Sequence, residues 1–180
     1  YDPEKAKALL EEAGATGMSL EINFPTGVVP QGPLVSQAIA ADLKRVGIDA
    51  TIQQDEWSVF AGKLFDFTNK QADLGSLFLM YYGAGPTLER VLATVLVSDR
   101  NWNWTHYDNP KVDELIRTAE TAPNDEVRRE AMLEMAQIVH DDAPWLFLYE
   151  MYRLWGVSNR IAWAGRANYL ISVQDMEPAE

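Results

Sequence analysis

Apolar residues recur with two different periods along most of the chain. The helical period, with apolar residues three and four positions apart, predicts helices over residues 3–13, 32–46, 57–65, 86–97, 110–121 and 124–141. The strand period predicts strands over residues 18–24 and 48–52, and a nearly unbroken apolar run predicts a third over residues 74–82. Because helices and strands alternate, the pattern predicts an α/β fold with a mainly parallel sheet flanked by helices.

Residues that begin or end regular structure support these elements. Pro3 can open the first helix, and Pro144 ends the last one. The unbroken apolar run suits a strand that is buried on both faces, as in a sheet covered by helices. After Pro144, residues 145–149 and 152–157 are expected to be extended, and the remaining tail is expected to be irregular.

Composition narrows the function. The chain has 180 residues, 47% hydrophobic and 23% charged, which is ordinary for one domain with a core. Its 27 acidic and 15 basic residues give a net charge of −12, which argues against binding of nucleic acid or of an anionic membrane surface. The absence of cysteine excludes thiol catalysis and disulfides. No apolar run is long enough to span a bilayer, and since neither an initiator Met nor a signal peptide is present we expect a piece of a longer protein.

The residues that carry chemistry indicate binding rather than catalysis. Of the two histidines, His106 and His140, only the second has neighbouring carboxylates, Asp141 and Asp142. These three could ligate a metal, but a histidine at a helix C-terminus beside solvated acids is the simpler interpretation. The motifs of serine hydrolases, zinc proteases and P-loop proteins are absent, so no catalytic residue, metal or cofactor is predicted. A hydrolase with paired carboxylates stays open as an alternative.

Aromatic side chains are the more informative candidates. The candidate ligand-binding residues follow strands or lie in loops: Trp57, Tyr81, Tyr82, Gly83, Trp102 and Trp104. Ligands of open α/β sheets bind at the carboxyl ends of the strands, and aromatic rings with polar edges suit peptides and sugars. The alternative is that the rings cover the core beneath loops, and the sequence does not decide between the two for Trp102 and Trp104. For Trp145, Trp155 and Trp163, which lie in apolar stretches, packing is favoured.

Several short stretches point to one family by their order and spacing. They are YDPEKAKALLEEAG at residues 1–14, AADLKRVGI at 40–48, EW at 56–57, YDNPKVDELI at 107–116, RREAMLEMAQ at 128–137 and DAPWL at 142–146. Together they resemble family 5 of the bacterial extracellular solute-binding proteins, the dipeptide, oligopeptide and nickel binders of ABC importers. The resemblance covers nearly the whole chain.

The resemblance implies a type II periplasmic-binding fold, in which two lobes close on a solute. It assigns residues 1–145 to the second lobe and residues 146–180 to a segment that returns toward a first lobe, which this sequence lacks. It also implies capture of a peptide or peptide-like compound, an opine or a sugar, delivery to ABC permease subunits, and no enzymatic activity. The implied location is periplasmic or extracellular, with or without a lipid anchor. A ligand sensor or chaperone-like binding protein of the same fold is the alternative.

One loop departs from the family. Peptide binders of this family usually carry an Asp after the third strand that holds the ligand's amino group, but residues 80–86 read MYYGAGP and contain no carboxylate. A buried ammonium group without a counter-charge is costly, so we expect Tyr81 and Tyr82 to stack on, or hydrogen-bond to, a ligand with hydroxyl or amide groups. A peptide held by the other lobe stays open. Trp57 matches the family's Trp beside the pocket. The isolated piece is expected to be poorly soluble, because the return segment would expose apolar surface.

Overall fold

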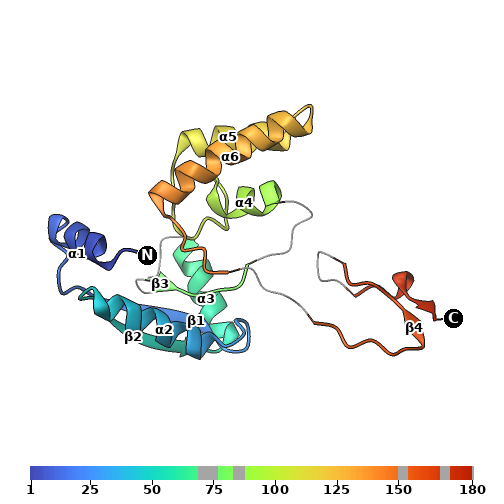
Figure 1. Ribbon diagram of the computed structural model, residues 1–180, viewed down its shortest axis with the longest axis horizontal. Helices are drawn as coiled ribbons and strands as arrows, with labels where there is room; N and C mark the ends of the chain where they lie inside the picture. The colour runs from blue at the N-terminus through green and yellow to red at the C-terminus, as the bar shows by residue number, and fades with distance from the viewer. Residues whose placement is uncertain (69–76, 83–87, 150–153, 167–170, 180) are drawn as a thin grey trace. The chain divides into compact units, whose positions relative to one another are not determined.

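The structure is a computed structural model that describes residues 1–68, 77–82, 88–149, 154–166 and 171–179 (Figure 1). The chain divides into two compact units, Tyr1–Tyr82 and Gly83–Glu180. The sequence predicted a different kind of boundary, between a lobe at residues 1–145 and a segment at 146–180 that returns toward the other lobe. That boundary stays a prediction.

The first unit is built on a parallel sheet. Its elements follow the chain in the order α1 (Pro3–Glu12), β1 (Ser19–Pro25), α2 (Gly32–Arg45), β2 (Asp49–Asp55), α3 (Trp57–Thr68) and β3 (Leu77–Phe78). β1 lies between β2 and β3, and both pairings are parallel. The chain returns to the sheet through α2 and then through α3, as parallel strands require a crossover. The predicted alternation of helices and strands is confirmed here.

Helices pack on both faces of this sheet. One face carries an apolar cluster that includes a side chain of α2: Phe24, Val29, Leu79 and Val35. Successive residues of a strand point to opposite faces, so Asn23 lies on the other face, together with its register partner Phe78. Phe60 of α3 packs against the Phe78 ring at a centroid distance of 6.4 Å. The α2 face is therefore apolar, whereas the α3 face holds both aromatic and polar side chains.

β3 is shorter than the apolar run predicts. Residues 74–76 of the predicted strand lie outside the described residues, and the ladder with β1 ends at Phe78. It is followed by one hydrogen bond, from the Leu79 N–H to the Asn23 carbonyl oxygen at 2.8 Å. The next donor on β1 would be Pro25, which has no N–H. The apolar chain therefore continues past the ladder without forming a strand.

The second unit contains helices α4 (Leu88–Leu96), α5 (Pro110–Glu120) and α6 (Asp125–Asp142), and α5 and α6 lie side by side (Figure 1). Asn109 and Asn124 cap α5 and α6 with side-chain oxygens that accept hydrogen bonds from backbone N–H groups of the first turn. The buried apolar residues of these helices include Leu96, Val112, Ile116, Ala119, Ala131, Met135 and Val139. No helix in the described part of the chain combines the length and apolar character needed to cross a membrane.

The C-terminal segment differs from the sequence prediction. Residues 145–149 and 152–157 were expected to be extended. Residues 152–153 lie outside the described residues, and the described positions, 145–149 and 154–157, belong to no strand. The tail was expected to be irregular, but β4 (Ile161–Ala162) pairs with β5 (Glu177–Pro178) in an antiparallel ladder, preceded by the 3-10 helix η1 (Val173–Asp175). A ladder of two residues per strand is too short to leave a period in the sequence.

Candidate ligand-binding surfaces

The carboxyl ends of β1, β2 and β3 lie at one edge of the sheet, because the strands are parallel. Open α/β sheets bind their ligands at this edge. Four polar side chains meet there on the α3 face: Asn23 from β1, Gln53 and Asp55 from β2, and Lys63 from α3. We call these four residues the sheet-end cluster.

Asp55 is the centre of the sheet-end cluster. Its Oδ1 accepts a hydrogen bond from Gln53 Nε2 at 3.0 Å, and its Oδ2 accepts one from Asn23 Nδ2 at 3.0 Å and pairs with the Lys63 ammonium group. The Asp55 side chain is 10% exposed. The bond from Lys63, aided by the two amide donors, lowers the pKa of Asp55 from 3.8 to about 2, although burial alone would raise it. Asp55 is therefore ionised at neutral pH and held by three donors.

Asn23 adds a buried amide to the cluster. Its side chain is fully buried, and its Nδ2 group donates to Asp55 and, at 3.5 Å, to Glu21. No described residue donates a hydrogen bond to Asn23 Oδ1. A buried acceptor left without a donor costs about 1–3 kcal/mol. This oxygen is therefore a candidate acceptor for a water molecule or for a ligand N–H or O–H group.

Trp57 stands beside the cluster, two residues after Asp55 and at the start of α3, with 49% of its surface exposed. Its ring lies 6.3 Å from the ring of Phe60, at an interplanar angle of 31°. Phe60 is fully buried and continues the contact to Phe78 of β3. The turn into α3 is closed by a hydrogen bond of 3.0 Å from the Phe60 N–H to the Glu56 carbonyl oxygen. Trp57 thus combines a supported ring with a surface open to solvent, as a ligand wall requires.

Tyr81 and Tyr82 follow β3 and are half-buried. Tyr81 packs against the apolar cluster on the α2 face. The ligand contact predicted for both tyrosines stays a prediction. Gly83 lies outside the described residues, so its predicted role has no structural account.

The two loop tryptophans of the second unit have different environments. Trp104 is 3% exposed and packs on the rings of Trp102, at 5.3 Å, and Trp145, at 6.4 Å. This burial favours the second interpretation of Trp104, a side chain that covers the core beneath the loop. Trp102 is 49% exposed and keeps a surface that a ligand can reach. The contact of Trp145 with Trp104 agrees with the packing role favoured for it.

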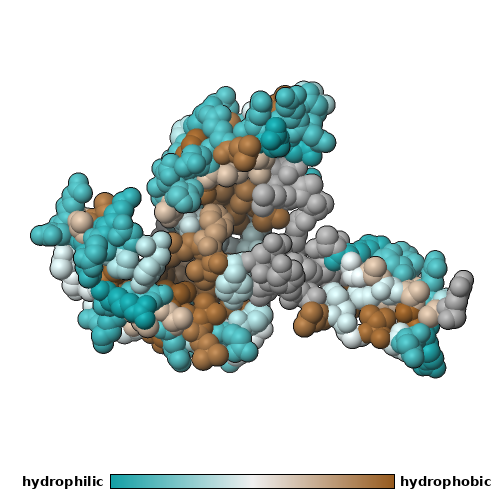
Figure 2. Space-filling model, in the orientation of Figure 1, coloured by the Kyte–Doolittle hydropathy of each residue, from teal (hydrophilic) through white to brown (hydrophobic). Residues whose placement is uncertain are grey.

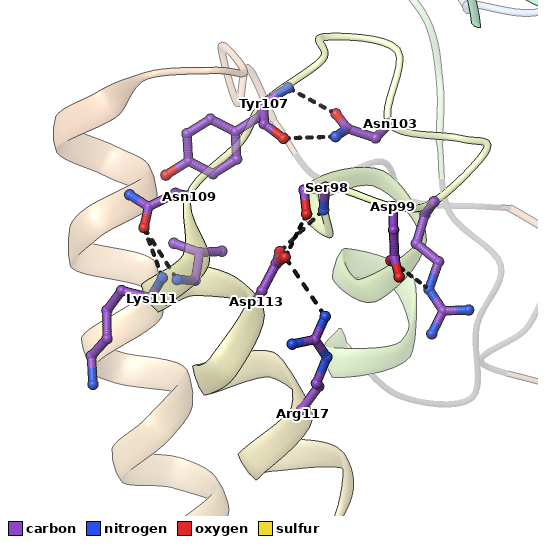
Figure 3. A network of polar contacts seen from close by, with 10 residues as sticks. Ser98, Asp99, Asn103, Tyr107, Asn109, Lys111, Asp113 and Arg117 are labelled. Carbon is purple, nitrogen blue, oxygen red and sulfur yellow. Dashed lines mark hydrogen bonds and ion pairs between the residues drawn. The ribbon is translucent and has the colours of Figure 1, made fainter.

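Polar contacts brace the loop that carries Trp102 (Figure 3). The buried Asn103 accepts a hydrogen bond from the Tyr107 N–H at 3.1 Å and donates one to the Tyr107 carbonyl oxygen at 2.7 Å. The Tyr107 hydroxyl donates to Asp142 Oδ2 at 2.5 Å, at the end of α6. Burial, together with this carboxylate, raises the pKa of Tyr107 to about 12. The loop is thus tied both to itself and to α6.

Asp113 joins the beginning of the same loop to α5. Its carboxylate is buried and accepts two hydrogen bonds from Ser98, one from the backbone N–H at 3.1 Å and one from the hydroxyl at 2.6 Å (Figure 3). Arg117, one turn further along α5, lies 3.7 Å away and is largely exposed. The Ser98 bonds, rather than the exposed ion pair, therefore hold this carboxylate.

Neither histidine forms part of a metal cluster in the described part of the chain. His106 belongs to the loop that carries Trp102, and its backbone N–H donates a hydrogen bond of 3.2 Å to the Asn103 carbonyl oxygen. His140 contacts Asp141 at 3.1 Å, and both side chains are exposed. The adjacent Asp142 accepts hydrogen bonds from Tyr107 and Asn109. Within the described ranges, no group of three or more histidine, aspartate or glutamate side chains is arranged to hold a metal ion.

Comparison with known proteins decides the family. Residues 1–104 match the bacterial extracellular solute-binding proteins, family 5 (middle). The chain belongs to family 5 of the bacterial extracellular solute-binding proteins. The resemblance drawn from the sequence motifs is confirmed.

Two curated relatives show how similar this chain is to known binding proteins. It is 35% identical over 156 residues to di/tripeptide-binding protein 2 of Pseudomonas aeruginosa, covering 81% of this chain and 28% of the relative. It is 30% identical over 156 residues to the dipeptide-binding protein of Escherichia coli, covering 82% and 28%. The chain therefore spans little more than a quarter of the length of these relatives.

Solved structures agree. A periplasmic oligopeptide-binding protein of Thermotoga maritima, determined with mannohexaose bound, matches with a TM-score of 0.68 at 25% identity, over 80% of this chain and 30% of that one. The periplasmic binding protein DppA of Helicobacter pylori, in complex with the peptide STSA, matches with a TM-score of 0.61 at 25% identity, over 80% and 28%. With the parallel sheet, these matches confirm the predicted α/β periplasmic-binding fold.

The sheet-end cluster was missed by sequence reasoning. Asn23 occupies a polar position of the alternating strand, where a solvated side chain is expected, so the pattern gave no signal of its burial. Asp55 and Lys63 carried no signal either, because charged residues near a helix start are common and usually solvated. Trp57 was chosen as a candidate because it follows a predicted strand, and its contact with a ligand stays a prediction.

Proposed function

We propose that this chain is part of the solute-binding component of an ABC importer and forms one wall of a ligand site between two lobes. Membership of family 5 carries the proposal. The relatives named as di/tripeptide-binding and dipeptide-binding proteins support a binding role without catalysis. In this role the protein captures a solute in the periplasm or outside the cell and hands it to the permease. No bond in the solute is made or broken.

The part played by this chain is to offer contacts that exist only when the lobes are closed. A ligand shifts a two-lobed protein toward its closed form by its difference in affinity for the two forms. Trp57 offers an exposed ring at the carboxyl end of the sheet, where ligands of such folds bind. In the second unit, Trp102 offers an exposed ring on a braced loop as a separate candidate contact. Both rings suit ligands that combine flat apolar faces with polar groups.

The proposed ligand is a peptide-like or sugar-like compound that is recognised here by stacking and hydrogen bonds. At the sheet end, the carboxylate of Asp55 already has donors on both oxygens and a cationic partner in Lys63. It is therefore poorly placed to pair with the amino group of a free peptide. The peptide STSA and mannohexaose, present in two structural neighbours, span this range of ligands.

The remaining wall is proposed to come from sequence outside this chain. The chain covers only 28% of its di/tripeptide-binding relative. Its C-terminal segment exposes apolar side chains, among them Leu154 at 96% and Val173 at 78% of their surfaces, and hydrophobic atoms lie at the surface around β4 (Figure 2). We propose that the first lobe covers part of this segment, as the predicted division at residue 145 implies.

A thermal-shift experiment on the full-length protein tests the function. A ligand that binds the native state raises the unfolding temperature by mass action. The panel comprises the peptide STSA, the same peptide with a blocked amino terminus, mannohexaose and nickel chloride. The proposal expects a shift with at least one organic compound, reduced in Trp57→Ala, while Trp163→Phe serves as the matched control outside both surfaces. A shift with nickel alone, or with none of the four, would contradict the proposed ligand class.

A further inference from the structure

We infer that Lys63 is a positioning residue for Trp57, and that its ion pair with Asp55 sets ligand affinity through the tryptophan rather than by touching the ligand. The inference rests on the proposed function, since it assigns a task within the same site. The ion pair of Lys63 with Asp55 and the ring contact of Trp57 with Phe60 both involve residues of α3 in the first unit.

The short stretch of chain between Asp55 and Lys63 contains Trp57, and this explains how their ion pair can position the tryptophan. Asp55 is the last residue of β2, Trp57 is the first residue of α3, and Lys63 lies six residues further along α3. The Lys63–Asp55 pair therefore closes a loop across the strand–helix junction, with Trp57 inside it. Movement of the start of α3 relative to the sheet would require this pair to open.

The sheet end of the junction is fixed independently. Asp55 stands opposite Pro25 in the parallel register, and its carbonyl oxygen accepts a hydrogen bond from the Thr26 N–H at 2.7 Å. Its carboxylate is also held by Asn23, which is fully buried in the neighbouring strand. The anion is thus an anchor within the sheet, and Lys63 is the group that attaches the helix to it.

The charge balance of the cluster makes Lys63 hard to replace. Asp55 is 10% exposed and stays ionised, so removal of the ammonium group leaves a mostly buried anion with only two neutral donors. Glu21, which contacts Asn23 at 3.5 Å, adds a second negative group beside the cluster. Without its cationic partner, the junction is expected to relax toward solvent and to carry Trp57 with it.

Aromatic contacts at the start of α3 connect the position of the helix to that of the Trp57 ring. Trp57 contacts Phe60 at 6.3 Å, and Phe60 is fully buried against Phe78. This single ring contact fixes one point of the helix start, and a second contact is needed to define its tilt on the sheet. The aromatic contact and the ion pair lie on successive turns of α3, and together they define its orientation on the sheet.

Fluorine NMR of the full-length protein, labelled with 5-fluorotryptophan, tests the inference without a ligand. The Trp57 resonance is assigned from its loss in Trp57→Phe. In Lys63→Met it is expected to shift or broaden while the other tryptophan resonances keep their positions, and Lys63→Arg is expected to restore it. Lys111→Met is the matched control, because it removes an ammonium group from an exposed ion pair with Glu134 in the second unit. Lys63→Gln, which keeps a donor, replaces Lys63→Met if the latter does not fold.

Binding of the peptide STSA gives the functional readout. If Lys63 loss leaves Trp57 correctly placed for about a tenth of the time, the apparent Kd rises about tenfold in Lys63→Met and returns toward the wild-type value in Lys63→Arg. An unchanged Trp57 resonance in Lys63→Met, or an unchanged Kd, would overturn the inference. Failure of the wild-type protein to bind STSA counts against this ligand class alone, and the fluorine spectra then decide the role of Lys63.

Discussion

Removal of the Asp113 carboxylate is expected to release the beginning of the loop that carries Trp102. In Asp113→Ala, the Ser98 N–H and hydroxyl lose the acceptor that they contact at 3.1 and 2.6 Å. A hydrogen bond to a charged group contributes about 1.5–3 kcal/mol, and the exposed Arg117 adds little. We therefore expect a loss of about 3 kcal/mol in the free energy that keeps this part of the loop closed. Asp113→Asn keeps one acceptor, so its loss is expected to be about half as large.

Hydrogen exchange of the Ser98 amide measures this loss locally, which suits a protein of several compact units. At about 1.4 kcal/mol per tenfold change, 3 kcal/mol corresponds to roughly 100-fold faster exchange in Asp113→Ala. Asp99→Asn is the matched control, because Asp99 is exposed and forms a long ion pair of 3.9 Å with the exposed Arg100. Equal exchange of Ser98 in Asp113→Ala and in the wild type, or equal acceleration in the control, would refute the reasoning.

Three further outcomes follow from the structure. The pKa of Asp55 is about 2, against 3.8 for the free side chain, so the ionised carboxylate contributes about 2 kcal/mol to the free energy of unfolding. This contribution is present above pH 4 and is lost as the pH falls toward 2. Carboxyl-carbon NMR should give a midpoint of titration near 2 that rises in Lys63→Met. Tyr107→Phe is expected to lower the free energy of unfolding by about 1 kcal/mol. Because the pKa of Tyr107 is raised to about 12, this contribution in the wild type is complete below pH 10 and is lost toward pH 12. Chemical denaturation of wild type and variant at neutral and alkaline pH checks this, and equal stability of the two at neutral pH would contradict it. Trp104→Ala is expected to cost about 3–5 kcal/mol because the side chain is buried, whereas Trp102→Ala should cost less than about 1 kcal/mol while weakening ligand binding; similar unfolding temperatures for the two variants would contradict the difference in burial.

Much of the architecture could be predicted from periodicity and end signals. The alternation over residues 18–24 and 48–52 gave the parallel strands, because each is followed by a helical pattern that supplies the crossover. Asn109 and Asn124 mark helix starts by a local mechanism, a side-chain oxygen that accepts backbone N–H groups. Such features depend on residues close in sequence, and therefore a sequence pattern is sufficient to reveal them.

The details of the site depend on contacts that no local pattern encodes. Trp102 and Trp104 are two residues apart in the same polar loop, yet one is half-exposed and the other buried. Two contacts account for the difference. The Asn103 side chain forms hydrogen bonds with the Tyr107 backbone and closes a turn of the loop, and Trp145, which follows α6 in the chain, packs against the ring of Trp104. The early end of β3 likewise depends on Pro25, which belongs to the neighbouring strand.

The two units use the same arrangement to hold an exposed tryptophan. In the first, the buried Asp55 gathers donors from strand and helix beside Trp57. In the second, the buried Asp113 gathers both donors of Ser98 at the start of the loop that carries Trp102. In each case the carboxylate already accepts hydrogen bonds from the protein, so it holds local structure and is poorly placed to bind a solute. In the proposed function, selectivity at these surfaces would come from the shape and orientation of the rings. Substitution of either anchoring carboxylate is therefore expected to change ligand affinity through the position of the nearby ring.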